Sequence, residues 1–577
     1  MTFLRRFRKK SPAPQNLDQA LVLQLSKSRI PGLRQLKYVG KFLSSTERKI
    51  VLICLLIALI GLGFLGRAFY KNNITTIPGD GGSYVEGVIG SPQYINPLYA
   101  SLNDADADLE KLIFSSLFTR DKEGRVINDL ADNISVSADE KTYTIKLKKA
   151  LWPNGQNVTA DDVVFTFNAL TNSDYKSPLR DKFSGVSIDK VDDQTIVFSL
   201  SDPYRDFTRL LDFGILSADA WESVSTDAVT LTELNIKPIG SGPYLFKTLV
   251  KSKNGTIHSY TLERNNNYYG EKGHLQEITF KFFPSAEEMI AAYNNGQING
   301  LSYVSPDLMS TIIAKNSLDY HQIALPELTS LYFNLTTKRA TSDKIVRQAL
   351  AAAINQTNIT NNSVGRAGMA SQTLLPSFIP GNDNVFKFDF NKAGSLLDSA
   401  GWTKNGDWRV NKDNKPLTIS LLATDDMKST AEEVAKAWQA LGIKVEVATH
   451  SDEVIQKDVI GNHQFEVLLY SGTIANGDPY PLWRSDSSTN ITGWKRKDVD
   501  KFLDQARVVD EKTAANLYHN FLIAAADDVP AIPLFWQAYV YPQTKKLKGF
   551  NLISLEDPSE RFDQATLWYL RTKYKLK

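Results

Sequence analysis

The chain has 577 residues, with 66 basic and 64 acidic side chains and a single cysteine, Cys54. This length exceeds what one hydrophobic core organises, so we expect at least two structural units. A lone cysteine excludes intramolecular disulfides and metal sites built from several thiolates.

Residues 50–65 form an apolar run that no acid, amide or base interrupts. Extended to Tyr70, the run reaches about 21 residues, or roughly 31 Å of α-helix. That length matches a hydrocarbon core of about 30 Å. A buried helix of a soluble core is the alternative, but the unbroken run favours a transmembrane anchor at 50–70.

The charge is distributed unevenly about this run. Residues 1–49 hold 12 of the 66 basic side chains and 2 of the 64 acidic ones, which leaves 54 and 62 for the rest. Lys and Arg beside a span are retained on the cytoplasmic side. We therefore expect a cytoplasmic N-terminus and an extracellular or periplasmic remainder. Binding of nucleic acid by the basic leader is not expected, because the leader lacks a folded context.

No small-residue cleavage site follows the run, since residues 66–69 read Gly-Arg-Ala-Phe. A cleaved signal peptide requires such a site, so we expect an uncleaved, single-pass anchor. Residues 61–66 match Gly-x-Gly-x-x-Gly, but they lie inside the apolar run without a preceding strand. A dinucleotide site is excluded by that context.

Linker and strand signals come next along the chain. Residues 71–82 are rich in Gly, Thr and Pro and read as a flexible linker. Residues 83–89 give the first strand signal. Residues 143–147 and 196–200 alternate apolar with polar side chains, the period of half-buried strands.

A helix is predicted to begin after Thr159. Thr159 and Asp162 have the spacing of a capping box, in which the side chain of each accepts a hydrogen bond from the backbone N–H of the other. The neighbouring carboxylates Asp161 and Asp162 could also form an acid/base couple. Capping and compensation of the helix dipole explain them better.

Helices and strands alternate in the second half. Residues 345–354 form an amphipathic helix face, and residues 417–421 alternate as a strand. A helix over 431–441 is predicted to end at Gly442, with another strand at 443–447. This alternation is typical of α/β packing.

Several segments carry a family resemblance in a fixed order. They include the stretch LWPNGQNVTADDVVFTF at 151–167, together with 91–97, 239–246, 264–269, 346–350 and 389–402. These segments resemble the bacterial family 5 extracellular solute-binding proteins, the peptide- and nickel-binding receptors of ABC importers. The resemblance covers roughly residues 83–560.

The resemblance implies an α/β, two-lobed periplasmic-binding-protein clamshell of the large, three-subdomain type. We place the chain crossings between lobes at residues 325–327 and 539–550, where Pro interrupts apolar segments. The expected parts are a basic cytoplasmic segment (1–49), the anchor (50–70), the linker (71–82), lobe I with an inserted subdomain (83–329), lobe II (330–540) and a return to lobe I (541–577).

The stretch 470–483 is the first candidate for ligand contact. It follows a short apolar strand at 465–469 and places Asn476, Asp478 and Trp483 on the loop after that strand. Ligands of α/β lobes bind at such loops. A tight turn in which Asp478 caps its own backbone is an equally supported interpretation.

Ala475 occupies a position that matters in the family. Peptide-binding members carry an acid there that pairs with the free amino group of the peptide, a contact worth about 1.5–3 kcal/mol. Either Asp478 replaces this acid, or the ligand depends weakly on its amino terminus. We hypothesise a peptide or peptide-like ligand of the second kind.

Four further side chains are expected to face the ligand. Tyr94 and Asn96 resemble the family's first-lobe loop, and Tyr332 and Asn334 lie beside the proposed crossing. Trp483, Trp494 and Trp536 offer stacking surfaces, although for each of them a core position is the favoured interpretation.

The expected function is that of a substrate-binding protein, without enzymatic activity or cofactor. It would capture peptides between its lobes and deliver them to a permease powered by separate ATPase subunits. Binding of nickel or a metal complex is the alternative, although the six histidines are scattered without an i, i+4 pair. A hydrolase is less favoured, because no nucleophile or metalloprotease motif occurs in the outer region.

Overall fold

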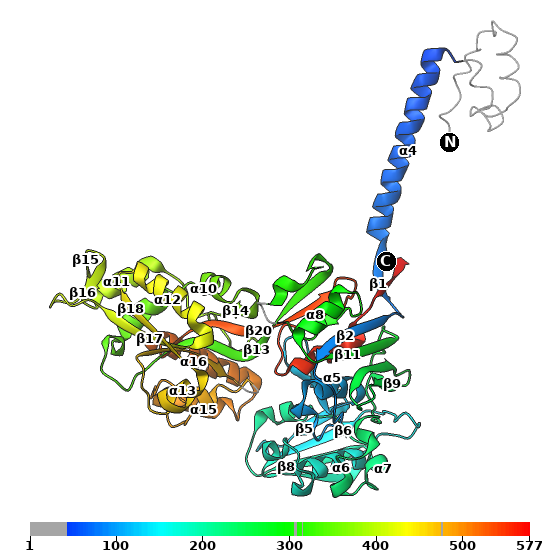
Figure 1. Ribbon diagram of the computed structural model, residues 1–577, viewed down its shortest axis with the longest axis horizontal. Helices are drawn as coiled ribbons and strands as arrows, with labels where there is room; N and C mark the ends of the chain where they lie inside the picture. Colours follow the sequence, from blue (N-terminus) through cyan, green and yellow to red (C-terminus); the bar gives the residue numbers. More distant parts are fainter. Residues whose placement is uncertain (1–42, 305–307, 314, 475–476, 577) are drawn as a thin grey trace, which may run out of the picture. The chain divides into compact units, whose positions relative to one another are not determined.

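The computed structural model describes residues 43–304, 308–313, 315–474 and 477–576 (Figure 1). It divides into two compact units. The first unit combines Met1–Ile77 with Thr572–Lys577, and the second comprises Pro78–Arg571.

In the described part of the first unit, residues Ser45–Asn73 form the long helix α4. Its segment Ser45–Leu65 has a mean hydropathy of 2.4 and no buried residues, so it is long and apolar enough to cross a membrane. Strand β1 (Ile74–Gly79) follows the helix at once and pairs with β21 (Arg571–Leu576). In the segment 71–82, which we predict as a flexible linker, residues 71–73 are therefore helical and residues 74–79 form a strand. The β-branched sequence at residues 74–77 favours the strand.

A large mixed sheet runs through the second unit. Its order is β18-β17-β19-β13-β20-β12-β2-β11-β10-β9, and β14 (Gly368–Ala370) pairs with β20. The strands are, in that order, Lys444–His450, Thr418–Thr424, Val467–Thr473, Leu318–Phe333, Ala531–Thr544, Gly300–Leu301, Ser83–Ile89, Glu277–Phe283, Ile257–Arg264 and Tyr244–Lys251.

Two strands of this sheet join two separate cores, which we name lobe I and lobe II. Ile323 of β13 belongs to the lobe I core, whereas Leu331 of the same strand belongs to the lobe II core. Strand β20 likewise contributes Leu534 to lobe II and Tyr541 to lobe I. The β13–β20 register shifts between Ala324 and Leu328, around Pro326, which has no N–H for the ladder.

Lobe I carries a second, four-stranded sheet with the order β5-β6-β8-β7. Its strands are Ala131–Val136, Thr142–Leu147, Thr195–Leu200 and Val186–Asp192. The alternating patterns at 143–147 and 196–200 are thus confirmed as β6 and β8, which pair antiparallel.

Helix α6 (Ala160–Thr171) begins with the predicted capping box. The backbone N–H of Thr159 donates to Asp162 Oδ2 at 2.8 Å. Asp162 also accepts from the Ala218 N–H at 2.8 Å and from Trp152 Nε1 at 3.2 Å. These bonds make the carboxylate a buried structural acceptor, so capping is confirmed for Asp162.

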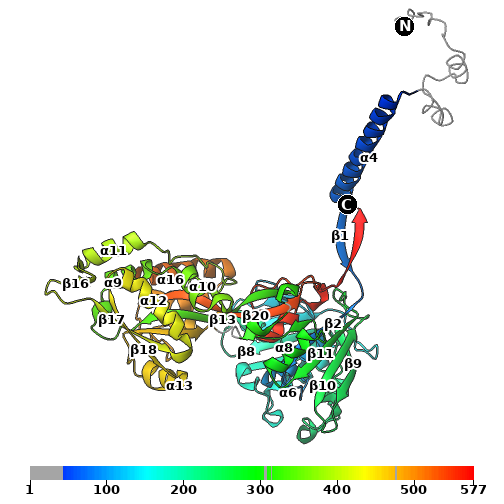
Figure 2. The same cartoon turned by 45° about the horizontal axis from the view of Figure 1, so that its top comes forward.

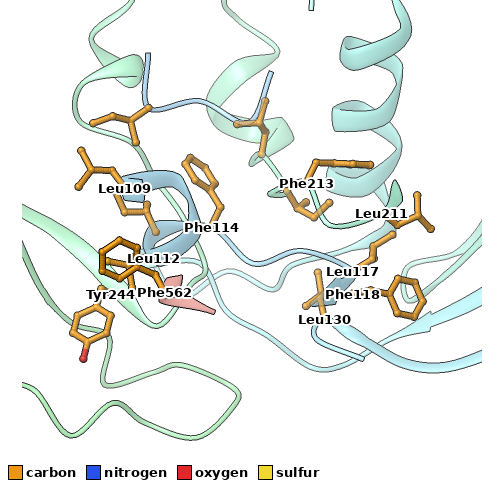
Figure 3. Close-up of a cluster of buried hydrophobic side chains, with 14 of the residues drawn as sticks. Leu109, Leu112, Phe114, Leu117, Phe118, Leu130, Leu211, Phe213, Tyr244 and Phe562 are labelled. Carbon is orange, nitrogen blue, oxygen red and sulfur yellow. The ribbon is translucent and has the colours of Figure 1, made fainter. Parts of the chain in front are cut away.

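The C-terminal segment returns to the core of lobe I, as Figure 3 shows. Phe562 lies in the 3₁₀ helix η14 (Pro558–Phe562) and packs with Leu109 and Leu112 of α5 (Asp104–Ile113). Side chains from distant segments meet in this cluster: Leu109, Leu112, Phe114, Leu117, Phe118, Leu130, Leu211, Phe213, Tyr244 and Phe562.

Lobe II has the predicted α/β alternation. Parallel strands β17 and β18 are joined through α12 (Lys428–Ala440). Gly442 follows with φ +85°, a left-handed conformation that glycine adopts without strain. The remaining helices and strands of lobe II are α9 (Lys344–Ala352), α10 (Gln356–Ser363), α11 (Phe390–Ser399), α13 (Asp452–Val454), α14 (Tyr480–Trp483), α15 (Lys497–Ala506), α16 (Glu511–Asp528), β15 (Thr403–Asn405) and β16 (Trp408–Val410). Outside lobe II lie α7 (Ala218–Trp221), α8 (Ala286–Asn294), β3 (Phe118–Arg120) and β4 (Val126–Asn128).

A buried ionic cluster links three elements of lobe I. Arg561 of η14 donates from Nη1 to Asp108 Oδ1 of α5 at 2.6 Å, and its Nη2 also contacts Asp108. Its Nε lies 3.6 Å from Glu86 Oε1 of β2. Glu86 accepts from the hydroxyls of Tyr84 at 2.6 Å and Tyr541 at 3.1 Å. Burial raises the pKa of Glu86 to about 7, against the opposing effects of Arg561 and the two tyrosines.

This pKa predicts that stability falls as the pH rises. Between pH 4.5, the ordinary pKa of the carboxyl, and pH 7, folded Glu86 holds a proton that the unfolded chain has lost. Its contribution is complete below pH 4.5 and is lost as the pH approaches 7, a change on the order of 3 kcal/mol. We expect the melting temperature of E86Q to fall less steeply between pH 5 and 7 than that of the natural sequence, measured by scanning calorimetry, because Asp108 and Glu110 also have raised pKa values of about 6 and about 7 and still contribute to the fall. Parallel curves for the two proteins would contradict this assignment.

Candidate functional site

A cavity of about 320 Å³ opens where the two lobes meet. Lobe I supplies most of its wall, including Arg120, Arg209 and Asp212. Pro326 of the crossing strand β13 and Thr473 at the end of β19 supply the remainder. The cavity therefore lies beside the register shift of β13, where movement of one lobe against the other would change its width.

Arg120 is the centre of the charged side of this cavity. It ends β3 and is almost completely buried. Its Nε lies 2.8 Å from Glu560 Oε1, and its Nη2 lies 2.9 Å from Glu556 Oε2 and 3.2 Å from Asp212 Oδ2. Three carboxylates thus fix one guanidinium in place.

Arg209 extends the same network. It lies in the 3₁₀ helix η4 (Arg205–Leu210), and its Nη1 is 2.7 Å from Glu556 Oε1. Burial raises the pKa of Glu556, although both arginines oppose the effect. Burial also favours a higher pKa for Asp212, but the positive charges of Lys111 and Arg120 hold that pKa below the usual value. The charged groups of the cavity are therefore oriented by one another.

The lobes also contact each other through two cation–π pairs. In the first, the Arg209 guanidinium of lobe I lies 4.5 Å from the ring centre of Phe378, a lobe II side chain. In the second, the Arg507 guanidinium of lobe II lies 5.8 Å from the ring centre of Tyr204, which packs against the lobe I core; within lobe II the same guanidinium lies 4.5 Å from the ring centre of Tyr480. Pairs of this kind contribute about 0.5–2 kcal/mol each.

Asp478 stabilises the turn in which it lies. Its Oδ1 accepts from the Tyr480 N–H at 3.0 Å, and its Oδ2 lies 3.2 Å from Arg507 Nε. The loop that carries it is also shorter than predicted, because β19 continues to Thr473. Ala475 and Asn476 lie outside the described residues.

The first-lobe candidates differ in exposure. Asn96 is fully buried: its Nδ2 donates to Asn235 Oδ1 at 3.0 Å, and its Oδ1 accepts from the Leu98 N–H at 2.9 Å. Tyr94 is half-buried, with its ring edge-on to Tyr99. Of this pair, Tyr94 retains surface that a ligand can reach.

The lobe II candidates are packed inside the lobe. Tyr332 stacks on Trp483 with ring centres 6.1 Å apart, and both are about 2% exposed. Asn334 Nδ2 donates to the carbonyls of His463 at 2.6 Å and Phe465 at 2.9 Å. Trp494 and Trp536 also belong to the lobe II core, which confirms the core interpretation for them.

The cavity and the predicted site residues are thus different sets. None of the six described candidates is among the side chains that line this cavity. Sequence reasoning missed Arg120, Arg209 and Glu556, and found Thr473 only as part of the stretch 470–483. The acidic residues at 556–560 were the available sequence signal for this charged cluster. However, Arg120, which pairs with Glu560, is 440 residues away in the chain.

Known proteins share both the sequence pattern and the fold. The chain is 28% identical to the oligopeptide-binding protein AppA of Bacillus subtilis over 505 residues, which cover 82% of this chain and 90% of AppA. It is 25% identical to the dipeptide-binding protein of Escherichia coli over 498 residues, 80% of this chain and 90% of that protein.

The crystal structure of the ABC transporter substrate-binding protein CtaP from Listeria monocytogenes matches with a TM-score of 0.66 and 24% identity, covering 85% of this chain and 99% of CtaP. The two-lobed α/β fold expected from the sequence is confirmed by this likeness. The family model for bacterial extracellular solute-binding proteins, family 5, matches residues 125–493. The chain therefore belongs to the family 5 bacterial extracellular solute-binding proteins.

Proposed function

We propose that this chain captures peptides or peptide-like solutes for an ABC importer. The observation that carries the proposal is the charged cavity at the junction of the lobes, because its fixed arginines and carboxylates suit the charged ends and amide groups of a peptide. The curated relatives named as oligopeptide- and dipeptide-binding proteins support the same ligand class.

The proposed mechanism is capture followed by closure. Ligand that contacts both lobes at once stabilises the closed state by its higher affinity for that state. Arg120 and Arg209 on lobe I and Thr473 on lobe II are positioned for such contact. Tyr94 and Asp478 remain candidates from the sequence. The bound receptor then delivers its ligand to a permease, and ATPase subunits supply the energy.

We further propose that α4 anchors this receptor in the cell membrane, with residues 1–49 on the cytoplasmic side and the lobes outside. The apolar segment Ser45–Leu65 and the basic residues that precede it support this placement. The chain is assigned a binding role and no catalytic step.

Thermal shift of the full chain in nanodiscs tests the ligand class. A ligand at 100 times its Kd adds about 2.7 kcal/mol to the free energy of unfolding. We expect short peptides to raise the melting temperature, and nickel–histidine complexes and oligosaccharides to leave it unchanged. Stabilisation by the nickel complex alone would overturn the proposal in favour of metal capture.

Acetylation of the peptide amino group is expected to weaken binding less than about tenfold, which corresponds to less than 1.4 kcal/mol. The reason is that position 475 carries no acid and that Asp478 is already engaged by Arg507. Calorimetric titration with matched free and acetylated peptides measures the difference. The variant A475D serves as the comparison, since a new acid there should increase the preference for the free amine. A loss above about 100-fold in the natural sequence would contradict the prediction.

A further inference from the structure

The outer end of α4 leads into a two-stranded ribbon formed by β1 and β21. Helix α4 ends at Asn73 and β1 begins at Ile74, without an intervening loop. In both views the arrow of β21 points back toward the end of α4, where the C-terminus is marked (Figures 1 and 2). The last strand of the chain therefore returns to the end of the proposed membrane anchor.

The ribbon begins in or just above the layer of lipid headgroups. Ile74 lies four residues, or about 6 Å along a helix, beyond the predicted end of the anchor at Tyr70, and nine residues, or about 14 Å, beyond Leu65, where the apolar segment of α4 ends. The headgroup layer on each side of a bilayer is roughly 5–8 Å thick. The first residues of β1 and the last residues of β21 are thus placed in or just above that layer.

The charge of this region has one sign. Residues 66–79 and 571–576 contain no Asp or Glu. Their basic residues are Arg67, Lys71, Arg571, Lys573 and Lys575.

Lys573, Tyr574 and Lys575 are exposed in β21, and Tyr574 is 66% exposed. Lys side chains beside an exposed tyrosine are typical of segments that rest on anionic lipid.

We propose that this ribbon binds the headgroups of anionic phospholipids in the outer leaflet, chiefly through Lys573 and Lys575. The inference rests on the membrane anchor of the proposed function, and it adds a second, electrostatic attachment at the other end of the chain. A helix with a single flexible linker would leave the receptor free to tilt. A lipid-bound ribbon instead holds both β1 and β21, which lie on either side of the lobes in the sequence, at the membrane surface.

Hydrogen exchange of the full chain in nanodiscs tests the proposal. An isolated two-stranded ribbon is only marginally stable in water, so exchange of its amides responds strongly to binding. We expect amides of β1 and β21 to exchange several-fold more slowly in discs that contain phosphatidylglycerol than in discs of phosphatidylcholine alone. High salt should abolish the difference, because it screens exposed charges.

Two matched variants make the test specific. K573Q/K575Q should remove the lipid dependence, whereas K545Q/K546Q, at two exposed lysines in the loop after β20, should retain it. Equal exchange in the two kinds of disc, or slowing that survives K573Q/K575Q, would overturn the proposal while leaving the anchor intact. Recovery of the chain outside the discs would instead refute the anchor, and with it this inference. Peptide titration of the same samples reports on the cavity independently.

Discussion

Replacing Arg561 by Met is expected to lower the free energy of unfolding by about 3–5 kcal/mol. Arg561 is 1% exposed and, at pH 8, above the pKa of about 7 of Glu86 and of about 6 of Asp108, it compensates both buried carboxylates. Removing the guanidinium leaves these acids without a counter-charge in the core of lobe I, and an uncompensated buried charge is costly. Thermal and denaturant unfolding of the full chain, followed by tryptophan fluorescence, measures the loss.

Two comparison variants separate the charge effect from loss of packing. R366M removes an exposed guanidinium that lies over Tyr320, and should cost less than about 1 kcal/mol. The double variant R561M/D108L replaces the buried pair by apolar groups and should recover part of the stability lost in R561M. A small loss in R561M, similar to that in R366M, would show that the cluster does not support the fold.

Replacing Thr473 by Trp is expected to weaken peptide binding at least about tenfold, or 1.4 kcal/mol. Thr473 is the lobe II side chain in the wall of the cavity and is exposed at the end of β19. An indole at this position occupies space that the ligand needs, and it obstructs the approach of the lobes around the ligand. Calorimetric titration with a peptide that stabilises the natural chain measures the change.

T403W provides the control, because Thr403 is also an exposed strand residue of the same part of the chain, in β15, and does not line the cavity. It should bind peptide as the natural sequence does. Unchanged affinity in T473W, with a melting temperature equal to that of T403W, would place the ligand elsewhere.

The local features of this protein were predictable from its sequence because their causes are local. The capping box of α6 depends on two residues three positions apart, and strands β6 and β8 show their period of two directly. The apolar run of α4 needs only its length and composition. In each case the physical interaction and the sequence pattern occupy the same short window.

The cavity could not be predicted in the same way. Arg120 and Glu560 are 440 residues apart, and only the return of the C-terminal segment to lobe I brings them together. Polar and aromatic side chains were also ambiguous. Asn334 resembles a ligand contact in the sequence, but in the fold it bonds to two backbone carbonyls. The sequence pattern alone does not distinguish a side chain that contacts a ligand from one that hydrogen-bonds to the backbone.

Composition predicted a flexible linker at residues 71–82, but residues 74–79 form the paired strand β1. The prediction failed there for a similar reason. Residues 71–82 contain Gly, Thr and Pro, but the partner strand β21 begins about 500 residues later in the chain. Pairing with a distant strand gives order to a segment whose own composition favours coil.

Cross-linking of a photoreactive peptide to the full chain in nanodiscs tests the central claim most directly, that ligand binds in the cavity between the lobes. Mass spectrometry of the labelled chain should find the peptide attached to the segments around Lys182, Thr473 and Asp557, which line the cavity from both lobes. Excess unlabelled peptide should prevent the labelling. Competable labels confined to one lobe, away from these three segments, would contradict the account.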